Sequence, residues 1–211
     1  MASTLVLADL SVTLRGRTLF RLSETVRAGE VLTIMGPSGV GKSSLLAAIS
    51  GNLDPAFSMS GSVNLDGQDI TGLPAYRRRI GILMQDDLLF PHLSVGQNLA
   101  FGLAAKGSRA QRREIIHAAL QDIDLAGFYH RDPASLSGGQ RVRVALLRTM
   151  LSEPEALLLD EPFSKLDQAL RQQIRSYVLA RAAGLPTILV THDPGDASGR
   201  VVTLTSRSQA A

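Results

Sequence analysis

One stretch near the N-terminus constrains the fold of this 211-residue chain more than any other. Residues 36–43 read GPSGVGKS, which matches the pattern G-x-x-x-x-G-K-[ST]. The apolar run VLTIM at 31–35 predicts a buried strand before it, and residues 42–50 predict a helix that ends at Gly51. A glycine-rich turn between a strand and a helix is the setting that this pattern requires, so the stretch predicts a phosphate-binding loop in an α/β domain.

This loop has the groups needed to hold a nucleoside triphosphate. Its glycines allow successive backbone N–H groups to face the phosphates, and the start of the following helix adds a favourable dipole. Lys42 places a positive charge near the β- and γ-phosphates, and the Ser43 hydroxyl can ligate Mg²⁺. The predicted nucleotide-binding residues of the loop are Gly36, Pro37, Ser38, Gly39, Val40, Gly41, Lys42, Ser43 and Ser44.

Further strands alternate with helices along the chain. Residues 62–65 and 80–84 read as strands, with the turn residues Asp66-Gly67 between them. Residues 156–159 are entirely apolar and predict a buried strand, and residues 187–190 (TILV) predict a further one. Because strands that are apolar on both faces alternate with helices, we expect a mostly parallel sheet that is covered on both sides.

The stretch from about residue 93 to 150 is largely helical and could form a separate lobe. Ser108 and Gln111 form a capping-box pattern at the start of one helix. Two more helices are predicted at 138–151 and 167–183. The side chains expected to face the core are Ile115, Ile116, Ala119, Leu120 and Ile123 in the first helix, Val142, Ala145, Leu146 and Met150 in the second, and Leu170, Ile174 and Val178 in the third.

Two carboxylates follow the apolar strand at 156–159. In P-loop proteins an acidic residue at the end of a neighbouring buried strand holds Mg²⁺, and Asp160 fits that position. Glu161 stands one residue further on and could project toward an attacking water as a general base.

The segment LSGGQ at 136–140 precedes ALLLDEP at 156–162. With these motifs the chain resembles the ATP-binding subunits of ABC transporters over nearly its whole length. GPSGVGKS corresponds to the family's Walker A motif, LSGGQ to its signature and ALLLDEP to Walker B. Gln85 lies in the matching Q-loop, residues 164–167 match the D-loop, and Thr191-His192-Asp193 matches the histidine switch.

The resemblance implies a single domain over residues 1–211. Its fold class would be α/β, with a P-loop NTPase (RecA-like) core at about 1–90 and 151–211 and a mostly parallel sheet. An N-terminal antiparallel β subdomain and a helical subdomain at about 91–150, which carries the signature, would complete it. No C-terminal regulatory domain is expected.

The resemblance also implies an ATP hydrolase that works as a head-to-tail dimer formed when ATP binds. The signature of one subunit would close over ATP held by the loop of the other, with a hydroxyl from Ser137 and a backbone N–H from Gly139 directed to the γ-phosphate. Asp167 would reach across the interface, although it also reads as a helix N-cap. The residues implied to contact the partner's nucleotide are Leu136, Ser137, Gly138, Gly139, Gln140 and Asp167.

Within one subunit, the resemblance assigns the remaining roles. The catalytic residues would be Lys42, Glu161 as the base, and His192, which holds the γ-phosphate and orients Glu161. The metal contacts would be Ser43, Gln85 and Asp160, with Gln85 and Asp160 also counted among the nucleotide-binding residues.

The segment FPHLSVGQNLAFGL at 90–103 resembles uptake-type subunits. That type implies two further partners, an integral membrane permease and an extracytoplasmic substrate-binding protein. The subunit would then lie at the cytoplasmic face of the inner membrane, attached through the permease. Export is the alternative because exporters share the motifs, and a soluble ABC-type ATPase acting on DNA or ribosomes is a more distant one.

Composition excludes several other classes. The absence of cysteine rules out disulfides and cysteine-ligated zinc or iron–sulfur sites. The N-terminus has no signal-peptide pattern, and the apolar runs are too short to cross a bilayer. An aromatic content of 4%, with no visible stacking platform, argues against nucleic-acid binding. The basic clusters at 76–79 and 112–113 read as solvated surface, with anionic lipid or a partner as the alternative.

The chain departs from the family's pattern at two places. The D-loop carries Lys165 where a small residue is common. The aromatic residue that stacks on the base in relatives would fall on Leu14 or Arg15, and the nearby Phe20 reads as a strand-core residue. We expect Arg15 to stack on the purine instead, with little discrimination between ATP and GTP.

Overall fold

The computed structural model describes residues 3–103 and 107–205. The chain divides into two compact units. The first unit is formed from Met1–Ile82, Glu155–Glu161 and Arg181–Ala211, and the second from Leu83–Pro154 and Pro162–Ala180.

A five-stranded sheet with the order β6-β7-β8-β3-β9 is present in the described part of the chain. Its strands are β3 (Val31–Met35), β6 (Ile80–Leu83), β7 (Ala156–Asp160), β8 (Thr187–Val190) and β9 (Arg200–Thr203). β8 runs parallel to both β7 and β3, and β3 runs parallel to β9. Every residue of β7 and β8 is buried, as expected for apolar strands in the middle of a parallel sheet.

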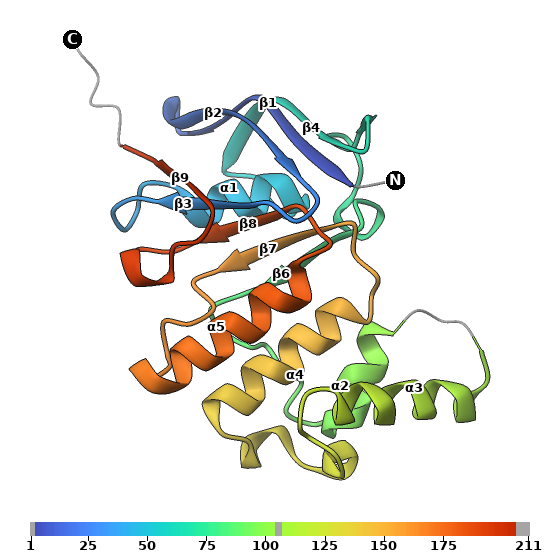
Figure 1. Cartoon of the computed structure of the whole chain (residues 1–211). Helices are drawn as coiled ribbons and strands as arrows, with labels where there is room; N and C mark the ends of the chain where they lie inside the picture. The colour runs from blue at the N-terminus through green and yellow to red at the C-terminus, as the bar shows by residue number, and fades with distance from the viewer. Residues whose placement is uncertain (1–2, 104–106, 206–211) are drawn as a thin grey trace. The chain divides into compact units, whose positions relative to one another are not determined.

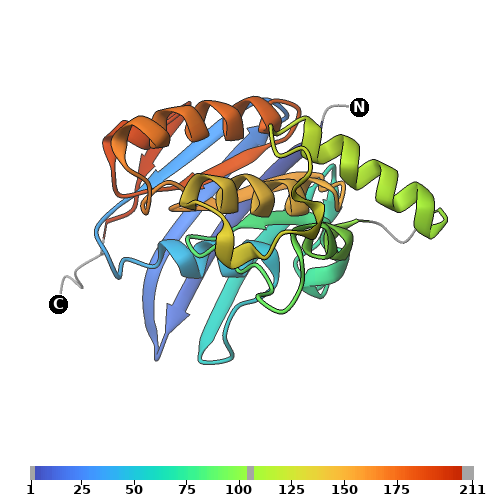
Figure 2. The same ribbon diagram turned by 90° about the horizontal axis from the view of Figure 1, so that it is seen from below.

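The first unit also holds an antiparallel sheet with the order β2-β1-β4-β5. It consists of β1 (Thr4–Leu14), β2 (Arg17–Arg27), β4 (Phe57–Leu65) and β5 (Gln68–Asp69). Figure 2 shows β2, β1 and β4 side by side. The turns at Arg15-Gly16 and Asp66-Gly67 have positive φ at both residues, which matches the twist of two-residue hairpins.

Helix α1 (Lys42–Ser50) lies between the two sheets of the first unit (Figure 1). It contacts both β1 and β7, and Leu45, Leu46 and Ile49 enter a core shared with both sheets. The helix ends at Gly51, which adopts the left-handed conformation that favours glycine. The predicted α/β class, mostly parallel sheet and N-terminal antiparallel sheet are therefore confirmed.

The second unit is mainly helical. It contains α2 (Val95–Gly102), α3 (Arg109–Gln121), α4 (Gly138–Met150), most of α5 (Gln168–Ala182) and the short 3₁₀ helices η2 (Phe128–His130) and η3 (Pro133–Ser135). Its core includes Val95, Leu99, Ile116, Leu120 and Val144. Two more 3₁₀ helices, η1 (Ala75–Arg77) and η4 (Pro194–Asp196), lie in the first unit. Within residues 3–103 and 107–205, no helix is both long and apolar enough to span a bilayer.

The turn at Asp66-Gly67 lies between β4 and β6 as predicted, and it leads into β5, which the sequence pattern did not reveal. One prediction about α3 was wrong. In α3, Ile115 was predicted to face the core, but it is 45% exposed because it lies beside the buried stripe of Ile116 and Leu120. Ile123 is buried as predicted, although α3 ends before it. The capping box of Ser108 and Gln111 at the start of α3 is confirmed.

The predicted inner face of α4 was also partly wrong. Val142 and Met150 are only half-buried, whereas Val144 and Leu147 are buried in the core of the second unit. The packing partners of α4 therefore lie on a face rotated from the predicted one. In α5, Ile174 and Val178 are buried as predicted, whereas Leu170 is only half-buried.

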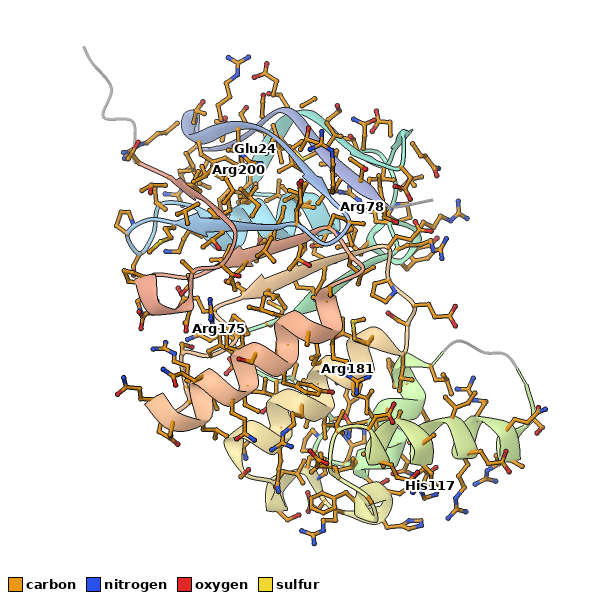
Figure 3. The ribbon with its side chains drawn as sticks, in the orientation of Figure 1. Glu24, Arg78, His117, Arg175, Arg181 and Arg200 are labelled. Carbon is orange, nitrogen blue, oxygen red and sulfur yellow. The ribbon has the colours of Figure 1, made fainter. Side chains whose placement is uncertain are left out.

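The interpretation of the basic cluster at 76–79 as solvated surface is wrong for Arg78, which is 5% exposed and labelled in Figure 3. Its guanidinium donates to the carbonyl oxygens of Ala48 and Ile49 at 2.8 Å, near the end of α1. It also donates to the carbonyl oxygens of Leu73 and Thr71. Arg78 therefore satisfies carbonyls that the end of a helix leaves without partners, a role that depends on chain folding rather than local pattern.

Arg112 was likewise interpreted as solvated surface, and it is half-buried. Its guanidinium donates to the carbonyl oxygens of Ala100 and Leu103 at the C-terminal end of α2. Arg113, in contrast, is exposed as predicted and lies over the ring of Tyr129.

Candidate functional site

The phosphate-loop segment lies between β3 and α1, as predicted. Gly36 and Gly41 have φ values of 149° and 104°, in the region that favours glycine. A Cβ on Gly36 would lie 2.6 Å from the carbonyl oxygen of Leu204, and a Cβ on Gly41 would lie 3.1 Å from the ring of Phe20. The backbone conformation therefore favours glycine at both positions, and at Gly36 the close backbone contact leaves no room for a Cβ. Phe20 is 4% exposed, which confirms its core role.

Lys42 is folded back over this loop and is only 7% exposed. Its Nζ donates to the carbonyl oxygen of Gly36 at 2.7 Å and to that of Pro37 at 3.2 Å. The N-cap residue Gly41 offers no side-chain acceptor to the first turn of α1. A cation and a helix start without a side-chain cap thus lie together, an arrangement that favours an anion.

Asp160 ends β7 and is 8% exposed. Burial raises the pKa of its carboxyl, and the neighbouring charge of Glu161 acts in the same direction. A hydrogen bond with Ser43 and the charge of Lys42 lower this pKa in turn. Because carboxylate and hydroxyl oxygens are ligands that Mg²⁺ prefers, the Asp160–Ser43 pair fits such an ion.

Glu161 follows β7 directly and contacts a residue that follows β8. Its Oε2 lies 2.9 Å from Nδ1 of His192, and its backbone N–H donates to the carbonyl oxygen of Val190. Glu161 also has a φ of 44°, a strained value for a residue other than glycine. Backbone strain of this kind costs about 1–3 kcal/mol and is concentrated at functional sites. The geometry therefore holds a carboxylate against an imidazole beside Asp160.

In the second unit, the LSGGQ segment opens α4 through a capping box. The Ser137 hydroxyl accepts from the N–H of Gln140 at 3.3 Å, and Oε1 of Gln140 accepts from the N–H of Ser137 at 2.9 Å. A hydroxyl has one donor and two acceptor positions, so Ser137 can still donate its hydrogen. The N–H groups of Gly138 and Gly139 lie in the first turn, where a helix offers no carbonyl partners.

The two glycines of this segment are also packed closely. A Cβ on Gly138 would lie 3.5 Å from Leu166, and one on Gly139 would lie 2.9 Å from Leu170. Asp167, between these leucines, accepts from the N–H of Leu170 at 3.0 Å. The interpretation of Asp167 as an N-cap of α5 is therefore confirmed.

Gln85 is exposed and lines a cavity of about 320 Å³ within the second unit. The same cavity is lined by Gly138 and Arg141 of α4 and by Lys165. Of the predicted site residues, the second unit thus contains Gln85, residues 136–140 and Asp167, and the first unit contains residues 36–44, Asp160, Glu161 and His192.

The charged residues around Gln85 were not predicted from the sequence. Lys165 forms an ion pair with Asp86, and Arg141 forms one with Asp87 at 3.0 Å. The unusual Lys165 was the only signal in the sequence that could have pointed to the first pair.

Arg15, the residue expected to stack on the base, is exposed at the first position of the β1–β2 turn. We expect Arg15→Ala to weaken ATP and GTP binding by a similar factor, about tenfold, since stacking on a π-face does not read base edges. Equilibrium titration of both nucleotides measures this. Arg17→Ala, on the other side of the same turn, is the control and should leave both affinities unchanged. Strong selectivity for ATP that survives Arg15→Ala would refute the stacking role.

A family model described as "ABC transporter" matches residues 19–164. The chain is 50% identical over 188 residues to an uncharacterized ABC transporter ATP-binding protein, YnjD, of Escherichia coli (strain K12). That match covers 86% of this chain and 87% of the relative.

Two further relatives carry the names of import proteins. The Fe(3+) ions import ATP-binding protein FbpC of Agrobacterium fabrum is 41% identical, over 87% of this chain and 53% of the relative. The sulfate/thiosulfate import ATP-binding protein CysA of Gloeobacter violaceus is 45% identical, over 82% and 50%. The chain therefore spans about half the length of these two relatives.

Proposed function

This chain belongs to the ABC transporter family as an ATP-binding subunit, and we propose that it hydrolyses ATP to drive substrate uptake through a separate membrane permease. One observation supports the proposed ATP hydrolysis: Glu161 contacts His192 at 2.9 Å. Glu161 directly follows Asp160, which interacts with Lys42 and Ser43. The import part is supported by the names of the relatives FbpC and CysA.

Most of the groups that would bind ATP and activate the attacking water belong to the first unit, and Gln85 belongs to the second. Lys42 and the backbone N–H groups at the start of α1 would hold the phosphates. Ser43 and Asp160 would hold Mg²⁺, with Gln85 as a further oxygen ligand, and the ion, when bound, would neutralise phosphate charge. Glu161 would accept a proton from the attacking water, and His192 would orient that carboxylate.

The signature segment would complete the site of a second copy in a head-to-tail dimer. Ser137 retains a hydroxyl hydrogen, and the N–H groups of Gly138 and Gly139 have no helical acceptors. Their acceptor would be the γ-phosphate held by the partner, and Asp167 would lie at the same interface. The signature segment would therefore bind the partner's ATP, whereas the chain's own ATP would be held by residues 36–44.

An exposed apolar surface on the second unit is the proposed contact with the permease. Phe101 is 72% exposed and Leu88 is 57% exposed. The ring of Phe90 lies 4.8 Å from that of Phe101, and the guanidinium of Arg148 lies over the Phe90 ring. Large exposed apolar side chains that gather on one surface mark interaction sites. The occupant we propose is a cytoplasmic segment of the permease, which would make this chain a membrane-associated subunit.

Co-purification tests the transport role. The native chain should be recovered from membranes with a multispanning protein, and Phe101→Glu should abolish that recovery because it places a charge in the contact. Ile115→Glu is the matched control, since Ile115 is also an exposed apolar residue of this unit. Recovery should survive it.

Uptake itself is tested with vesicles that contain this complex and an extracytoplasmic binding protein. ATP should drive substrate inward. Movement outward would favour an exporter, and recovery with ribosomes or DNA instead of a membrane protein would favour a non-transport ATPase.

A further inference from the structure

Three segments of the second unit meet here: residues 86–88, which follow Gln85, helix α4 and the segment 162–167. The carboxylate of Asp86 pairs with the ammonium group of Lys165, and that of Asp87 pairs with Arg141 at 3.0 Å. Arg148 donates to the backbone carbonyl oxygens of Asp87 and Leu88, at 3.0 and 2.9 Å. Two arginines of α4 and one lysine of the segment 162–167 therefore hold residues 86–88.

The backbone around Lys165 is itself well anchored. Phe163 is fully buried, and its carbonyl oxygen accepts from the N–H of Leu166 at 3.1 Å. Leu166 packs against Gly138, and Asp167 caps α5. Lys165 thus extends from a fixed turn, so its ammonium group is a defined point of attachment for Asp86.

The side chain of Gln85 is not enclosed by its surroundings. Gln85 is exposed and lines the cavity of about 320 Å³, which leaves its side chain room to move. The position of the Gln85 side chain then depends on the contacts that hold residues 86–88. Arg141 and Arg148 both act on Asp87 or beyond, whereas Lys165 acts on the residue directly after Gln85.

We propose that Lys165 is a positioning residue: through Asp86 it sets the location of Gln85 and ties it to the segment that carries Asp167. This inference rests on the proposed function, in which Gln85 serves the chain's own nucleotide and Asp167 the partner's. A small side chain at position 165 could not reach Asp86, so the ion pair depends on the lysine at this place.

Four variants test the pair: Lys165→Met, Asp86→Asn, the combination of both, and the reversed pair Lys165→Asp with Asp86→Lys. We expect each single variant to lower kcat for ATP about two- to fivefold, with KM unchanged. This range is the interaction free energy of an exposed ion pair expressed as a fold-change. The combination should be no worse than either single variant, because both remove one interaction. The reversed pair should recover most of the loss.

The matched control is Arg21→Met, which removes the Arg21–Asp9 ion pair in the first unit. The side chains of that pair are 60% and 56% exposed, close to the 60% and 69% of Lys165 and Asp86. Its kcat and KM should equal those of the native chain. Unchanged kcat in Lys165→Met, or single losses that multiply in the combination, would overturn the proposal.

Amide hydrogen exchange without nucleotide separates this inference from the proposed function. Lys165→Met should speed exchange of residues 84–88, and the reversed pair should slow it again, whether or not the protein hydrolyses ATP. A native chain without ATPase activity would refute the proposed function, whereas unchanged exchange at 84–88 in Lys165→Met would refute the positioning role alone.

Discussion

Glu161→Gln is expected to retain ATP binding and to lose at least about a hundredfold in turnover, since general-base catalysis contributes about 10²–10⁴. The amide has nearly the same shape as the carboxylate, so the contact with His192 can persist, but an amide cannot accept a proton from water. Steady-state kcat and equilibrium ATP affinity measure the two effects. Light scattering should show the variant as an ATP-bound dimer, because hydrolysis no longer releases it.

The control for this variant is Glu155→Gln. Glu155 precedes β7, as Glu161 follows it, and pairs with Arg79 away from His192. Its turnover should remain near that of the native chain. Normal turnover in Glu161→Gln would show that another group is the base.

The second large effect concerns the division of the site between two subunits. Lys42→Ala removes the cation of the phosphate loop, and Ser137→Arg blocks the signature segment, so each homodimer should be inactive. A mixture of the two should recover about a quarter of native turnover, because about half of randomly formed dimers are mixed and each has one intact site. ATPase activity of the mixture, measured beside the separate variants, checks this.

Ser137→Arg also removes a helix cap, so its control must remove an equivalent cap elsewhere. Ser108 caps α3 through the same capping box, with Gln111 in place of Gln140. Ser108→Arg should lose similar stability and keep its turnover. No recovery in the mixture, once mixed dimers are demonstrated, would indicate that a single chain completes its own nucleotide site or that one site alone cannot work.

Local rules were sufficient to predict much of this chain from its sequence. Residues 31–50 form the strand, loop and helix that GPSGVGKS requires, because glycine tolerates the positive φ values of the loop. Ser108 and Asp167 cap helices as expected, since an N-cap depends on residues only three positions apart. Roles for Gln85, Ser137 and His192 came from motif resemblance and remain predictions.

Contacts between distant residues were decided by the tertiary structure. Arg78 and Ile115 were assigned to the wrong environment because burial depends on which elements pack around them, and neither residue's neighbours in sequence reveal this. Lys165 finds Asp86 across 79 positions of the chain, and Glu161 meets His192 across 31. Periodicity and turn chemistry act over a few residues, whereas an ion pair or a buried guanidinium depends on where the whole chain brings its partners.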